Sequence, residues 1–82
     1  MSIAEQRKRW REEEEEVSER YGVAFERMRD AQLAVTRQFY PLGNGSPTPE
    51  SLAAADKARG EFDAIKREFD RIADEIRTGK RS

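Results

Sequence analysis

Residues 55–76 read ADKARGEFDAIKREFDRIADEI, and their apolar side chains recur at alternating steps of three and four. One heptad position holds Ala55, Phe62, Phe69 and Ile76, and the other holds Ala58, Ile65 and Ile72. This spacing is typical of a coiled-coil seam, which is narrower than the apolar stripe of an ordinary globular helix. Glutamates and basic residues flank the seam, so we expect a helix with solvated sides.

Both ends of this helix carry recognisable signals. Thr48 is a favourable N-cap, and Pro49 suits the first helical position because its missing N–H would have no partner there. Gly79 is a typical C-terminal stop. The sequence therefore predicts a helix over about residues 49–78, followed by a frayed tail at 79–82.

An apolar stripe of period 3.6 predicts a longer helix in the first half of the chain. It runs along Ile3, Trp10, Val17, Tyr21, Phe25, Met28, Val35 and Phe39. Pro41 disfavours the α conformation at Tyr40. We therefore expect this helix over about residues 2–39.

All three prolines lie between residues 41 and 49, which predicts a loop at residues 40–48. The fold class is then all-α, a single antiparallel two-helix hairpin domain over residues 1–82. The predicted register places Val17 opposite Ile72 and Tyr21 opposite Phe69. The expected core of the hairpin, or of its dimer, is Val17, Tyr21, Phe25, Met28, Val35, Phe39, Leu52, Phe62, Ile65, Phe69, Ile72 and Ile76.

The composition excludes several kinds of site. Cysteine and histidine are both absent, so disulfides, Cys/His zinc sites and histidine-dependent triads are impossible. Gly43-Asn44-Gly45 is not followed by the Lys-Ser/Thr of a phosphate loop. Five successive glutamates, residues 12–16, point around the whole helix and cannot converge on one ion. We expect a non-enzymatic protein without a cofactor or metal.

The charge balance bears on partners and location. Charged residues make up 40% of the chain but leave a net charge of −1, which argues against a general nucleic-acid binder. No apolar run is long enough to span a membrane, and no signal peptide is visible. We expect a cytoplasmic protein, with signal-independent secretion left open.

The predicted hairpin is uneven. Its first helix overhangs the second by about two turns, and Trp10 would face only Gly79 and the tail. A chain this short without disulfide or metal often associates to complete its core. We therefore expect a homodimer forming a four-helix bundle, or a hairpin docked on another protein.

Two segments are candidates for partner binding. Arg7, Arg9, Trp10 and Arg11 form a basic-aromatic cluster, although the acidic run that follows also fits a helix face of internal ion pairs. Tyr40 and Leu42 lie at the predicted hairpin tip, where loops on rigid scaffolds often make contacts. The alternative is that they close the apolar end of the bundle.

These features favour a small protein-interaction module, an adaptor or regulator that acts through helical-bundle contacts. In size, topology and its Pro47-Thr48-Pro49 loop, the predicted hairpin resembles the needle subunits of type III secretion systems. That resemblance implies an alternative, a filament or secretion assembly subunit or its chaperone, although the charged flanks differ from such subunits. A small nucleic-acid-binding bundle with basic ends is a third hypothesis.

Overall fold

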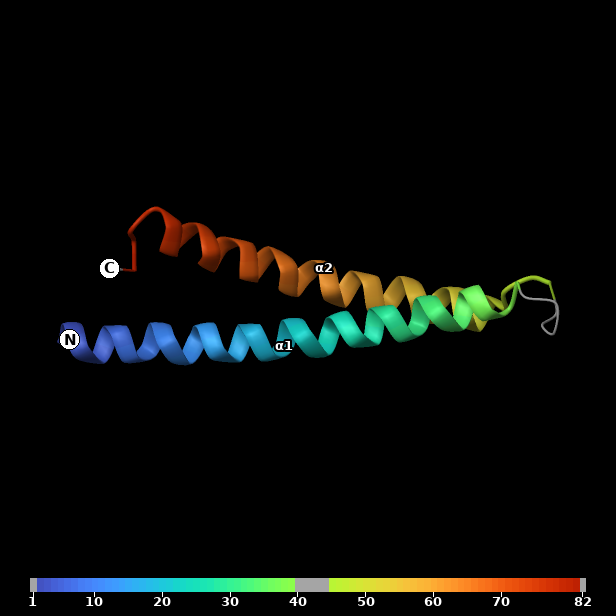
Figure 1. Ribbon diagram of the computed structural model, residues 1–82, viewed down its shortest axis with the longest axis horizontal. Helices are drawn as coiled ribbons and strands as arrows, with labels where there is room; N and C mark the ends of the chain where they lie inside the picture. Colours follow the sequence, from blue (N-terminus) through green and yellow to red (C-terminus); the bar gives the residue numbers. More distant parts are fainter. Residues whose placement is uncertain (1, 40–44, 82) are drawn as a thin grey trace.

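The computed structural model describes residues 2–39 and 45–81, which form two long helices packed side by side (Figure 1). Helix α1 spans Ile3–Arg37 and helix α2 spans Pro49–Arg77. The predicted all-α hairpin is therefore confirmed. Helix α1 ends earlier than expected, because Gln38 and Phe39 close a tighter turn. Their N–H groups donate to the carbonyls of Val35 and Thr36, three residues back, at 3.2 and 3.1 Å.

Each helix begins at a hydroxyl side chain. The Ser2 hydroxyl accepts a hydrogen bond from the N–H of Glu5 at 3.2 Å, and the Thr48 hydroxyl accepts one from Ser51, also at 3.2 Å. These bonds satisfy N–H groups that have no partner within the first turn. The predicted cap at Thr48, with Pro49 next to it, is confirmed.

Helix α2 ends in a Schellman motif at Gly79, which has a φ of 81°. The N–H of Lys80 donates to the Glu75 carbonyl at 2.8 Å, and that of Gly79 donates to the Ile76 carbonyl at 3.2 Å. Glycine adopts this left-handed conformation without steric cost. The motif turns the chain back toward α1 (Figure 1).

The helices meet along a coiled-coil seam. Among the described residues, the buried hydrophobic side chains are Val17, Ala24, Ala58 and Ile72. Ring centroids of Tyr21 and Phe69 lie 4.9 Å apart, and those of Tyr21 and Phe62 lie 5.1 Å apart. The predicted pairing of Tyr21 with Phe69 is thus confirmed.

The seam of α1 differs from the predicted stripe. Ala24 is buried and Ala31 half-buried, while Phe25 and Phe39 are 43% and 61% exposed in the single chain. The prediction followed a straight helix of period 3.6, whereas a supercoiled pair keeps contact every 3.5 residues. Over several heptads the contact line therefore returns to Ala24 and Ala31 rather than drifting to the phenylalanines.

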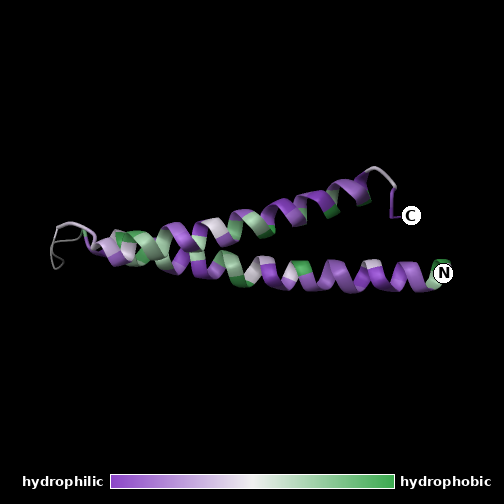
Figure 2. Cartoon of the chain, turned by 180° about the vertical axis from the view of Figure 1, so that it is seen from behind, coloured by the Kyte–Doolittle hydropathy of each residue, from purple (hydrophilic) through white to green (hydrophobic). Residues whose placement is uncertain are grey.

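The molecule is a thin rod of 60 × 19 × 17 Å. Its radius of gyration is 18.2 Å, against about 12 Å expected for a globular chain of this length. Its accessible area of 6426 Å² likewise exceeds the roughly 5,000 Å² of a typical folded monomer of this mass. Hydrophobic residues extend from the loop to the middle of both helices, while the N-terminal part of α1 is mostly hydrophilic (Figure 2).

Candidate interaction surface

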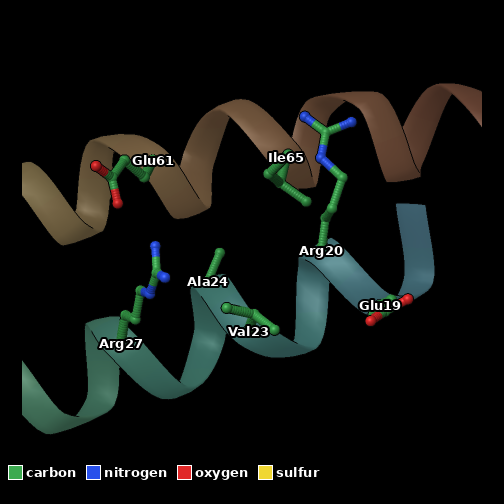
Figure 3. Close-up of a pocket in the computed structure, with 7 residues that line it drawn as sticks. All are labelled: Glu19, Arg20, Val23, Ala24, Arg27, Glu61 and Ile65. Carbon is green, nitrogen blue, oxygen red and sulfur yellow. The ribbon is translucent and has the colours of Figure 1, made fainter. Parts of the chain in front are cut away.

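One long side of the hairpin carries facing charges. This charged face is formed by Glu13, Arg20 and Arg27 of α1 and by Glu61, Glu68 and Glu75 of α2. Arg20 Nη1 lies 3.6 Å from Glu68 Oε2, and Arg27 extends toward Glu61 beside a shallow groove (Figure 3). Because the Arg20–Glu68 pair is solvent-exposed, it adds only about 0.2–1 kcal/mol. The charged face is thus matched within one chain.

At the open end of the hairpin the same face brings two acids together, Glu13 and Glu75. The returning tail inserts Arg81 between them. Its Nε donates to Glu75 Oε1 at 3.0 Å, and its Nη2 donates to Glu13 Oε1. The Arg81 carbon Cζ also lies 5.8 Å from the centroid of the Trp10 ring. We call Trp10, Glu13, Glu75 and Arg81 the tail clasp.

The clasp changes the ionisation of its members. Desolvation would raise the pKa of Glu75, but hydrogen bonds and charges from Arg81 and Arg71 outweigh it and hold that pKa below its ordinary value. Desolvation would lower the pKa of Arg81, but the bonds to Glu13 and Glu75 raise it. The Arg81 side chain is only 6% exposed, and its Nη1 finds no hydrogen-bond partner among the described residues. This unmet donor offsets part of what the clasp gains.

The clasp bears on two expectations. Trp10 is half-buried beside Arg81, so it faces the tail as predicted. The tail is not frayed, however, because Arg81 bonds to Glu13 and Glu75. Arg7, Arg9 and Arg11 are exposed, and none of them makes an ion pair with another described residue. The basic-aromatic cluster therefore does not converge on one point, and its binding to a partner stays a prediction.

At the loop end, a glutamine joins the two helices. Gln38 Oε1 accepts from the N–H of Thr48 at 2.9 Å, and Gln38 Nε2 donates to the Ser51 hydroxyl at 2.8 Å. The Gln38 carbonyl also accepts from the N–H of Gly45 at 3.1 Å. These bonds fix where α2 starts relative to the end of α1. Tyr40 and Leu42, the predicted tip contacts, lie outside the described residues.

The opposite side of the hairpin carries exposed apolar side chains among a few polar and basic ones. This apolar face carries Phe25, Phe39, Leu52, Phe69 and Ile76, and all five are exposed in the single chain. The sequence placed these residues in the core of the hairpin or of its dimer. The hairpin alone does not bury them, and their burial in a dimer stays a prediction.

A shallow groove runs along the apolar face between the helices. Its lining is Glu14, Val17, Ser18, Phe69, Ile72, Ala73 and Ile76. Ser18 of α1 and Ala73 of α2 are its small residues, and Phe69 and Ile76 are exposed side chains beside them. The groove is thus shaped to receive a bulky apolar side chain.

Comparison with protein-family models, with curated proteins and with solved structures finds no match. Within residues 2–39 and 45–81, no helix is long and apolar enough to cross a membrane. The same residues contain no cluster of three or more acidic side chains placed to hold a metal ion. The surfaces described above are therefore the features from which a function can be inferred.

Sequence reasoning missed Gln38, Ala24 and Arg81. A strict heptad count from Val17 reaches Ala24, Ala31 and Gln38, so it would have found both Ala24 and Gln38. No sequence signal identified Arg81, because its position depends on the direction in which the Gly79 turn sends the tail.

Proposed function

We propose that this chain is a small non-enzymatic protein-interaction module, an adaptor or regulator. It self-associates through the apolar face into a four-helix bundle. The supporting observation is the gathering of five exposed large apolar side chains on one side of the rod, while the charged face opposite is matched internally. Exposed apolar patches of this kind mark interaction sites in monomeric chains.

The size of the surface supports the proposal. The chain exposes over a thousand Å² more than a typical monomer of its mass. A standard interface buries about 800 Å² per partner, and the excess area is large enough to include one. The dimer would leave the charged faces and the exposed basic residues Arg7 and Arg9 available to a further protein partner.

The test compares variants of matched exposure by sedimentation velocity at micromolar concentration. Phe25 on the apolar face is 43% exposed, and Leu33, which does not belong to it, is 42% exposed. We expect a dimer for the wild-type chain and for Leu33→Ser, and a shift to monomer for Phe25→Ser. Circular dichroism should show helices retained in each.

Ile76→Lys provides a second variant on the same face, since Ile76 is 53% exposed in the single chain. It should also shift the chain to monomer. A wild-type chain that sediments as a monomer throughout this range would overturn the proposal.

A further inference from the structure

One flank of α1 carries a row of side chains that is complementary to the same row running in the opposite direction. Moving in steps of seven, it presents Ala4, Arg11, Ser18, Phe25, Gln32 and, in the turn after the helix, Phe39. All six residues are exposed. When the same row of a second copy runs antiparallel to it, centred at the level of Tyr21 and Gly22, each phenylalanine of one copy lies opposite a small residue of the other.

We propose that the second copy packs with its loop at the opposite end, so that the two α1 helices run antiparallel about a two-fold axis beside Gly22. This inference rests on the self-association proposed above and specifies its geometry. A two-fold interface repeats each contact, so every complementary pair occurs twice. Four-helix bundles formed from hairpins permit this arrangement.

Size complementarity is the first argument. Phe25 of one copy falls level with Ser18 of the other, where the groove on the apolar face is lined by Val17, Phe69 and Ile76. Phe39, which is 61% exposed, falls level with Ala4. The antiparallel copy therefore covers the exposed rings and also uses the α1 overhang, which finds no partner helix in its own hairpin.

Charge complementarity is the second argument. The neighbouring row of α1 reads Lys8, Glu15, Gly22, Arg29 and Thr36 in steps of seven. In the antiparallel dimer centred on Gly22, Glu15 of each copy lies opposite Arg29 of the other, so this ion pair occurs twice. Gly22 itself is exposed, and a Cβ at this position would meet no atom within 4 Å in the single chain. The missing side chain lets two helix backbones approach closely at the axis.

The competing arrangement places both loops at one end and packs α1 against α2 of the second copy. Phe25 would then lie level with Lys66, and Ser18 with Ala73, so the groove between two small residues would stay unfilled. Phe39 would meet an apolar residue there, Leu52, but Phe25 would not. Like-charge contacts do not distinguish the two arrangements, because each brings one pair of basic residues together. The pair is Arg11 with Lys80 in the competing arrangement and Arg59 with Lys80 in the antiparallel dimer. Size matching therefore decides in favour of the antiparallel dimer.

Engineered cysteines test the geometry, because the chain has no cysteine of its own. Gly22→Cys should form an intermolecular disulfide on mild oxidation, since its thiols meet at the axis. A mixture of Ser18→Cys and Ala73→Cys chains should not form a mixed disulfide. A Ser18–Ala73 crosslink without one at position 22 would overturn the inference while leaving self-association intact. A chain that sediments as a monomer would overturn both the antiparallel geometry and the proposed self-association.

A charge exchange gives an independent readout. Glu15→Arg and Arg29→Glu should each weaken the dimer by about tenfold, because each sets like charges together at two places. The double variant Glu15→Arg/Arg29→Glu has the wild-type net charge and should recover wild-type affinity. The matched exchange Glu12→Arg/Arg9→Glu changes two exposed residues outside this interface and should show no such pattern. Additive weakening in the first double variant would contradict the antiparallel geometry.

Discussion

The guanidinium of Arg81 lies over the ring of Trp10, with 5.8 Å between Cζ and the ring centroid. These residues come from opposite ends of the sequence, and their contact closes the open end of the hairpin. Arg81 also separates Glu13 from Glu75, which would otherwise form a like-charge pair. The tail is therefore part of the folded hairpin.

Removing Arg81 should open this end. In Arg81→Ala, Trp10 loses its cover and Glu13 repels Glu75, so the tryptophan emission should shift to the red and the midpoint of thermal unfolding should fall. Trp10 is the chain's one tryptophan, so its fluorescence reports this site directly. Lys80→Ala, which changes the exposed neighbour, is the control. An identical emission spectrum in the two variants would contradict the clasp.

The clasp should also depend on pH. Because the pKa of Glu75 is lower in the folded chain than the ordinary glutamate value of about 4.5, folding favours the ionised carboxylate. Its contribution to stability is full above about pH 4.5 and is lost as pH falls through the lowered folded pKa. In wild type, Trp10 emission should shift to the red over that acidic range. In Glu75→Gln this acidic transition should be absent or clearly reduced.

Gln38 should stabilise the closure of the hairpin. Gln38→Ala removes the side-chain bonds to Thr48 and Ser51, and we expect it to lower the free energy of unfolding by about 1–2 kcal/mol. Gln6→Ala removes the same type of side chain from an exposed site near the start of α1 and should change stability by less than about 0.5 kcal/mol. Chemical denaturation measures both. Equal effects would show that the Gln38 bonds add nothing.

The two helical glycines should respond differently to substitution. A Cβ at Gly22 or Gly60 meets no atom within 4 Å in the single chain, so a larger residue at either position should raise helix stability by up to about 1 kcal/mol. Gly22→Leu should nevertheless weaken the dimer, because it lies at the proposed axis, whereas Gly60→Leu should not. Sedimentation and circular dichroism on both variants separate these effects. Unchanged dimerisation in Gly22→Leu would contradict the close approach.

The heptad of α2 predicted the fold from sequence because both its seam positions are apolar throughout residues 55–76. Its ends were equally readable, since Thr48 and Gly79 act through local backbone geometry. The seam of α1 was harder to predict. Alanines at positions 24 and 31 give a weaker hydrophobic signal than Phe25, and supercoiling decides between them.

The candidate surfaces were less predictable than the fold. Five apolar residues expected in a core are exposed in the single chain, and the sequence could not show which side of the hairpin they would share. That depends on the rotation of each helix about its own axis. The clasp depends on the path of the tail after Gly79, which no periodic pattern specifies.

The most direct test of the central claim is the mass of the wild-type chain in solution. The single chain is 9.5 kDa, and sedimentation equilibrium in the micromolar range should give twice that value, because the apolar face is covered by a second copy. A mass that stays at 9.5 kDa across this range would contradict the account.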